Sequence, residues 1–135
     1  MSTWLLKTEP GAFSFSDLVR AKKSVWDGVT NSLALIHLRK MRNGDRLFIY
    51  HTGGEKKIVG LAQAVSDAYP DPKARNPKLV VFDLAPLRAL KKPVPLAALK
   101  GDARFKDFAL VKISRLSVMP VPPAIEKALL ALAEE

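Results

Sequence analysis

The hydrophobic positions of the chain fall into short runs that are separated by turn-forming residues. Glycines at positions 53 and 54, followed by Glu55, predict a hairpin between two of these runs. Runs rich in Val, Ile, Leu and aromatic side chains predict β-strands over residues 3–7, 46–52, 57–66 and 78–87, with one or two further strands within 110–121 that are interrupted near Arg115.

Apolar positions three and four residues apart predict the helices. The Ser14-x-x-Asp17 capping pattern indicates a helix over residues 14–23. Asn31 as a cap and Asn43-Gly44 as a stop signal indicate a second helix over residues 31–42, whose last turn is basic. Pro122-Pro123 opens a terminal helix that runs to about Ala133.

Two connecting segments complete the pattern. Residues 95–100 predict a single helical turn. Residues 67–77 contain three prolines, which favour an ordered loop without a helix.

Hairpin-linked strands with helices at their periphery predict an α+β fold, built as a small curled sheet or barrel. The 135 residues carry no internal repeat, so we expect one domain over residues 1–135, and a monomer. A chain of this length buries roughly two-thirds of its unfolded surface, which is enough for a core without crosslinks.

Composition excludes several classes of site. The chain has no Cys, so disulfides, thiolate metal sites and a cysteine nucleophile are ruled out. No apolar run reaches the length of a signal-peptide core or of a membrane span. We therefore expect a cytoplasmic protein with no membrane contact.

The chain carries 22 Lys and Arg against 13 Asp and Glu, a formal net charge of +9. Such an excess favours nucleic acid as a partner, because Lys and Arg release condensed counterions from phosphates. The alternative is a basic surface that binds nothing in particular. The candidate phosphate contacts are Lys22, Lys23, Arg39, Lys40, Lys56 and Lys57.

Catalytic and cofactor signatures are mostly absent from the sequence. The Gly53-Gly54 pair lacks the spacing of a phosphate-binding loop, and the two histidines, His37 and His51, have no metal-site spacing. We expect a protein without metal, cofactor or enzymatic activity. Two alternatives stay open. One is an enzyme acting on nucleic acid or a nucleotide, with Glu9, Asp27 or His51 transferring protons, and the other is a protein-interaction module.

Polar and aromatic residues gather where the predicted strands meet turns. These segments read Lys7-Thr8-Glu9-Pro10, Trp26-Asp27-Gly28-Val29-Thr30-Asn31, Tyr50-His51-Thr52 and, from Arg115 to Val121, RLSVMPV. Together with Trp4-Leu5, Met41-x-x-Gly44-Asp45, Val59-Gly60 and Tyr69-Pro70-Asp71, they occur in the order found in the EVE domain family, which the chain closely resembles over nearly its whole length.

The resemblance implies a PUA-like fold, a small mixed β-barrel flanked by short helices. It also implies a non-enzymatic reader of modified DNA or RNA that holds one extruded base in a pocket, with no established cofactor. The barrel agrees with the strands predicted above.

An extruded base forfeits stacking, so a pocket that receives it needs flat aromatic faces, for which Trp26 and Tyr50 are the candidates. Trp4 is a third, although a core position is the better interpretation for it. Base edges carry donors and acceptors, which calls for a mixed polar set such as Glu9, Asn31, Ser117 and the backbone of Val118. The candidate ligand-binding residues are Lys7, Thr8, Glu9, Trp26, Asn31, Tyr50, His51, Thr52, Ser117 and Val118.

Three of the candidate side chains have structural alternatives. Lys7 can contact a flanking phosphate, or be a solvated charge or a partner for Glu9. Asp27 precedes a glycine, which favours a turn-closing role. His51 can donate to a base carbonyl or brace the end of its strand.

The chain departs from the family pattern after the Trp-Asp-Gly-Val motif. Family members commonly carry Arg next, and often Tyr and Gln after the Asn, whereas this chain has Thr30, Ser32 and Leu33. Thr cannot make the two-pronged contact of Arg, so we expect no Arg-type contact at position 30. The identity of the base is correspondingly open.

Overall fold

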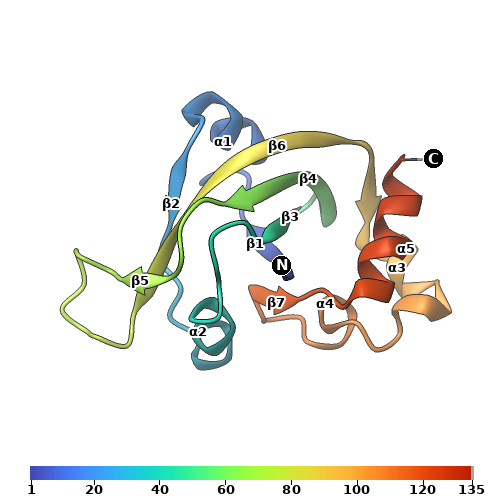
Figure 1. The fold of residues 1–135 in the computed structure, drawn as a ribbon. Helices are drawn as coiled ribbons and strands as arrows, with labels where there is room; N and C mark the ends of the chain where they lie inside the picture. Colours follow the sequence, from blue (N-terminus) through green and yellow to red (C-terminus); the bar gives the residue numbers. More distant parts are fainter. Residues whose placement is uncertain (135) are drawn as a thin grey trace.

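A computed structural model describes residues 1–134 of the protein (Figure 1). Seven strands form one mixed sheet in the order β2-β6-β4-β3-β1-β7, and β5 pairs with β6 beside this path. The long β6 arches over the sheet and the short β7 lies on the opposite side, which gives a curled half-barrel (Figure 1). The predicted α+β class and curled sheet are confirmed. The strands are β1 (Thr3–Thr8), β2 (Ser24–Trp26), β3 (Arg46–His51), β4 (Lys57–Ala64), β5 (Tyr69–Pro70), β6 (Val80–Pro95) and β7 (Val118–Pro120).

The sheet brings separate polar segments together at one end. β1 and β3 are parallel, with Lys7 opposite Tyr50, so both strands finish at the same place. β7 runs antiparallel to β1, and the Lys7 backbone N–H donates to the Ser117 carbonyl oxygen at 2.9 Å. The residues that follow β1 and those that precede β7 therefore lie side by side.

Short helices surround the sheet, and the predicted caps are confirmed. Ser14 and Asp17 form a reciprocal capping box, with bonds of 3.1 and 2.9 Å. Asn31 Oδ1 accepts from the backbone N–H of Ala34 at 3.0 Å and starts the second helix. The helices are α1 (Phe15–Ala21), α2 (Ser32–Leu38), α3 (Leu96–Lys100), α4 (Ala109–Lys112) and α5 (Pro123–Glu134), with a 3₁₀ turn η1 at Ala103–Phe105.

Helix α1 docks on the sheet through its first residue. The Phe15 ring lies directly over Gly60 of β4, where an added Cβ would come within 2.4 Å of Phe15 Cε1. Only glycine permits this approach without displacing the ring, so the Val59-Gly60 motif has a packing role.

Trp4 is a core residue, as its sequence context favoured. Its ring is buried, and Nε1 donates to Asp45 Oδ2 at 2.9 Å. Asp45, itself buried, also accepts from the backbone N–H groups of Ser2 and Arg42, each at 3.0 Å. The carboxylate thus ties the chain start to the turn before β3.

The helix predicted over residues 31–42 is wrong at its end, because α2 stops at Leu38. Beyond it, Lys40 and Met41 donate to carbonyls three residues back, at 3.0 Å each, which tightens the chain into turns. Met41 is fully buried there, and Asp45 captures the next backbone N–H. Core packing and a buried carboxylate end the helix before the Asn-Gly stop signal.

Of the one or two strands predicted within residues 110–121, one is present, and residues 109–112, before Arg115, form a helix. The Phe108 carbonyl accepts from Val111 and Lys112 at 2.9 and 3.1 Å, which folds Ala109–Lys112 into α4. Only Val118–Pro120 forms a strand, and it pairs with three residues of β1. The local helical bonds leave little chain to extend along that edge.

One strand is longer than predicted, and another was not predicted at all. β6 continues to Pro95 beyond the predicted end at residue 87, and its register against β4 shifts between Ile58 and Gly60 and again at Leu61. Such irregularities accommodate prolines, which cannot donate to a ladder. β2 was not predicted, because three residues are too few to show the alternation of apolar and polar positions that marks a strand. It forms by pairing with β6, Trp26 opposite Phe82.

Other predictions hold. The hairpin at 53–55 joins antiparallel β3 and β4, and residues 67–77 contain no helix but include the two-residue β5. The helical turn after Pro95 and the terminal helix from Pro123 are both present. None of the helices within residues 1–134 has the length and hydropathy needed to cross a membrane.

Candidate nucleic-acid pocket

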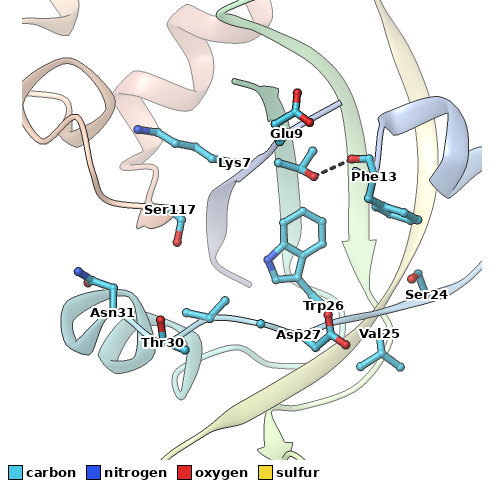
Figure 2. A pocket seen from close by; sticks show the side chains of 13 residues that line it. Lys7, Glu9, Phe13, Ser24, Val25, Trp26, Asp27, Thr30, Asn31 and Ser117 are labelled. Carbon is cyan, nitrogen blue, oxygen red and sulfur yellow. Dashed lines mark hydrogen bonds between the residues drawn. The ribbon is translucent and has the colours of Figure 1, made fainter. Parts of the chain in front are cut away.

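A pocket of about 530 Å³ lies between the end of β1, β2 with the segment that follows it, and Ser117 just before β7 (Figure 2). This volume is within the roughly 300–1,000 Å³ typical of small-ligand sites. Residues 7–9, Phe13, residues 24–31 and Ser117 line it. Three of the four polar segments noted in the sequence therefore share one cavity.

The Trp26 indole stands at the centre of this pocket (Figure 2). The residue is 9% exposed, so most of it is packed while part of it lines the cavity. Its Nε1 is turned toward the side where Ser117 and Asn31 lie (Figure 2), and it has no hydrogen-bond partner within residues 1–134. The pocket thus offers a flat apolar surface with an unused donor.

Three further residues with polar side chains line the same pocket as Trp26. The Glu9 carboxylate is exposed and lies beside Gly11, where an added Cβ would come within 2.8 Å of Glu9 Oε2. Asn31 uses Oδ1 to cap α2, which leaves its amide N–H groups free to donate. Ser117 is half-buried, and its hydroxyl can both donate and accept a hydrogen bond. The set combines an acceptor, a donor and a group with both capacities.

Thr8 holds the pocket wall in shape. Its hydroxyl donates to the Phe13 carbonyl at 2.6 Å, and its carbonyl accepts from the Thr52 N–H at 2.9 Å. The first bond closes the turn after β1, and the second clamps that turn to β3. Thr8 therefore positions Glu9 and Phe13 along the cavity.

Lys7 lies at the border of the pocket and points away from Trp26 (Figure 2). Its Nζ donates to the Ser114 carbonyl at 2.8 Å and lies 5.8 Å from the centre of the Tyr50 ring. Partial burial lowers the pKa of the Lys7 ammonium below its usual value. The pairing of Lys7 with Glu9 that the sequence left open is not formed within residues 1–134.

Tyr50 and Thr52 line a second, smaller cavity of about 290 Å³, which also includes Lys7. The Tyr50 ring is buried, and burial raises the pKa of its hydroxyl. The structure therefore does not bring Tyr50 face to face with Trp26 across one pocket.

His51 and Val118 line neither cavity. His51 Nε2 accepts from the Phe15 backbone N–H at 3.0 Å, and Nδ1 lies 3.0 Å from Glu55 Oε1. These contacts fit the structural alternative, in which His51 braces the end of its strand. The Val118 side chain is fully buried opposite Leu6, which leaves only its backbone for a ligand.

The six basic residues proposed for phosphate contacts are dispersed. Lys56 lines the second cavity, and Arg39 lines a third, of about 470 Å³, which shares Thr30 with the Trp26 pocket. Lys23 lies 3.6 Å from Asp83, and Arg39 donates to the Lys78 carbonyl at 2.8 Å. Lys22, Lys40 and Lys57 line none of these cavities.

Sequence reasoning missed the apolar wall of the pocket and one cation. Phe13 and Val29 line the pocket, and Lys100 lines the second cavity. Val29 belongs to the Trp-Asp-Gly-Val motif and could have been found there, whereas no local signal marks Lys100. Within residues 1–134, no group of three or more acidic or His side chains is placed to hold a metal ion.

Comparison with known proteins identifies the family. The EVE domain model matches residues 2–132. Human thymocyte nuclear protein 1 is 32% identical over 168 residues, covering 99% of this chain and 75% of the human protein. An NMR structure of a protein from Rhodopseudomonas palustris is 41% identical with a TM-score of 0.93, covering 98% of this chain and 93% of that one.

One solved structure is a crystal structure of the human protein in complex with 5-methylcytosine-containing DNA. Its protein chain shares 32% sequence identity with this chain and superposes with a TM-score of 0.89. The match covers 100% of this chain and 99% of the human protein's chain in that structure. These likenesses confirm the PUA-like fold that the sequence resemblance implied. The chain belongs to the EVE domain family.

Proposed function

We propose that this EVE domain reads modified nucleic acid by holding one extruded base in the Trp26 pocket, with 5-methylcytosine in DNA as the first candidate. The observation that carries the proposal is Trp26 itself. A partly accessible indole with an unpartnered Nε1 stands among polar groups that are free to bond a ligand. Base–aromatic stacking contributes about 1–3 kcal/mol per base, enough to offset much of the cost of extrusion.

The polar set suits the edge of a pyrimidine. Cytosine presents an amino donor at N4 and acceptors at N3 and O2. The Glu9 carboxylate can accept from the amino group, while Asn31 Nδ2 and Trp26 Nε1 can donate to the ring acceptors. Each of these protein groups lacks an internal partner within residues 1–134, so a base would satisfy them without breaking existing bonds.

A methyl group on C5 would add apolar surface, for which Phe13 and Val29 supply a wall. Burying one such carbon contributes about 0.8 kcal/mol, which corresponds to about a fourfold preference over unmethylated cytosine. The complex of human thymocyte nuclear protein 1 with 5-methylcytosine-containing DNA supports this candidate. Thr30 lines the pocket where relatives commonly carry Arg, so other modified bases belong in the same test.

The enzymatic alternative requires proton transfer at the pocket. Both ring nitrogens of His51 are engaged, and the ring lies outside the cavity. Glu9 and Asp27 line the pocket and are the acids left for such a role. Mass analysis of the oligonucleotide after incubation tests this alternative, because catalysis would change the mass of the base or strand and a reader would not.

The test of the proposed function is a fluorescence anisotropy titration. Matched single-stranded and duplex DNA, and the corresponding RNA, would carry cytosine, 5-methylcytosine or another modified base at one position. We expect salt-dependent binding with at least a fourfold preference for one modified base. Equal affinity for modified and unmodified strands would overturn the proposal, and affinity independent of salt would favour a protein-interaction module.

A further inference from the structure

The second cavity is exclusively basic among its charged residues. Lys7, Lys56 and Lys100 line it, and no acidic side chain does. The neighbouring Trp26 pocket, by contrast, has Glu9 and Asp27 in its wall. The two cavities share Lys7 but differ in the rest of their charged lining, which is acidic in the Trp26 pocket and basic in the second cavity.

We propose that this second cavity binds the phosphodiester next to the extruded nucleotide, with Lys7, Lys56 and Lys100 as its cationic ligands. The proposal rests on the proposed function, because it assigns the strand's backbone to one cavity and its base to the other. Lys7 lines both cavities, so they are immediate neighbours. A base and its own phosphate are joined through a single sugar and need adjacent sites of this kind.

The three lysines have unused charge. None of them forms an ion pair within residues 1–134. The Lys7 ammonium makes one hydrogen bond, to the Ser114 carbonyl, and so keeps two N–H groups for a ligand. Partial burial lowers the pKa of this ammonium, and a bound anion would act in the opposite direction by favouring its charged form.

The cavity is also fixed in shape by the fold. Lys7 comes from β1, Lys56 from the β3–β4 hairpin and Lys100 from the end of α3. The Leu96 backbone N–H donates to the Lys56 carbonyl at 2.8 Å, which attaches the hairpin to the start of α3. Lys56 adopts a left-handed backbone with φ of 47° in that turn. Lysines from three anchored elements thus line one cavity.

The experiment compares two double variants with equal charge change. Lys56→Gln with Lys100→Gln removes two ligands of the cavity, whereas Lys91→Gln with Lys92→Gln removes two exposed lysines of β6 that line neither cavity. For duplex DNA, the log-log salt dependence of binding should become shallower by about 1.8 in the first variant, since each contact contributes about 0.9. The slope of the second should match that of the wild type.

The preference between modified and unmodified cytosine should be the same in both variants, because the base pocket is untouched. Lys100→Gln alone should change the salt-dependence slope by about half as much. This single variant keeps the test valid if the double variant folds poorly. Equal slopes for the two double variants would overturn the phosphate site while leaving the reader function intact.

A second measurement is independent of base recognition. Titration of the wild type with inorganic pyrophosphate, followed by ¹H–¹⁵N NMR, should shift the Gly53 and Ser114 amides, and less so in the Lys56→Gln, Lys100→Gln variant. A pyrophosphate response in a protein without base preference would overturn the reader function but support the anion site. Shifts that are equal in both proteins would overturn the anion site.

Discussion

The His51 imidazole accepts a hydrogen bond from the Phe15 backbone N–H at 3.0 Å, which joins the last residue of β3 to the first residue of α1. Phe15 also covers Gly60 with its ring, so one residue anchors α1 through its backbone and its side chain. Because Phe15 N–H donates to Nε2, the proton of the neutral ring lies on Nδ1 and points to Glu55. These contacts fix α1 against the end of β3.

Replacing His51 with Ala should destabilise the protein without removing base preference. The buried Phe15 N–H would lose its acceptor, which costs about 1–3 kcal/mol. Urea unfolding gives the loss of stability, and anisotropy gives the preference among bases. His51→Gln, whose amide oxygen can accept the same N–H, should recover part of the stability. A variant of normal stability that loses base preference would instead make His51 a ligand.

Trp26→Ala should weaken binding of the preferred oligonucleotide by roughly 1–3 kcal/mol, the cost of losing one stacked base. The competing structural interpretation is that this truncation only opens a cavity in the core, which lowers the melting temperature without ligand. Thermal unfolding measured beside affinity separates the two effects. A badly destabilised variant, or one that binds as well as the wild type, would remove Trp26 from the site.

A pair of Trp→Phe variants gives a sharper comparison. Trp26 Nε1 has no partner within residues 1–134, whereas Trp4 Nε1 donates to the buried Asp45. Both truncations remove packing from a mostly buried ring, but only Trp4→Phe also removes a donor from the buried Asp45 carboxylate. Trp26→Phe should therefore lose affinity, and Trp4→Phe should keep affinity and lose about 1–3 kcal/mol more stability than Trp26→Phe does. The opposite pattern would assign the binding role to Trp4 and contradict the proposed pocket.

Local signals account for the elements that the sequence predicted well. The Ser14 and Asp17 side chains make α1 start where it does through bonds within four residues, and Asn31 does the same for α2. The end of α2 depends on Asp45 and on burial of Met41, which are contacts with the core and are invisible to a local pattern. β2 likewise exists only through its pairing with β6.

The sequence motifs also predicted part of the candidate site. The motifs place Glu9, Trp26, Asn31 and Ser117 around one pocket, and their binding roles stay predictions. Tyr50 and His51 are consecutive residues of a strand, whose side chains point to opposite faces. One pocket could not hold both, and in the structure the ring of Tyr50 lines the second cavity while His51 packs against α1.

Stability should fall at alkaline pH in a way that depends on Tyr69. Its hydroxyl donates to Asp83 Oδ1 at 2.6 Å, and this bond, with burial, raises the pKa of Tyr69 from 10.0 to about 12. The folded state holds this proton more tightly than the unfolded state, so its contribution is complete below pH 10 and is lost as pH rises toward 12. Urea unfolding at pH 8 and 11 should show a smaller difference for Tyr69→Phe than for the wild type, since other groups titrate alike in both. An equal decline in both proteins would contradict this role.

Ser117→Ala should change selectivity more than affinity. The Ser117 hydroxyl has no hydrogen-bond partner within residues 1–134, and the contact to β1 is made by its backbone carbonyl, which alanine retains. Stability should therefore stay within about 0.5 kcal/mol of the wild type. If the hydroxyl bonds a base edge, its loss removes about 0.5–1.5 kcal/mol from the better ligand and narrows the gap between modified and unmodified DNA. Ser16→Ala, on the exposed face of α1 and outside the pocket, is the matched control. Paired anisotropy titrations of both variants measure this gap, and an unchanged ratio for Ser117→Ala would show that the hydroxyl takes no part in recognition.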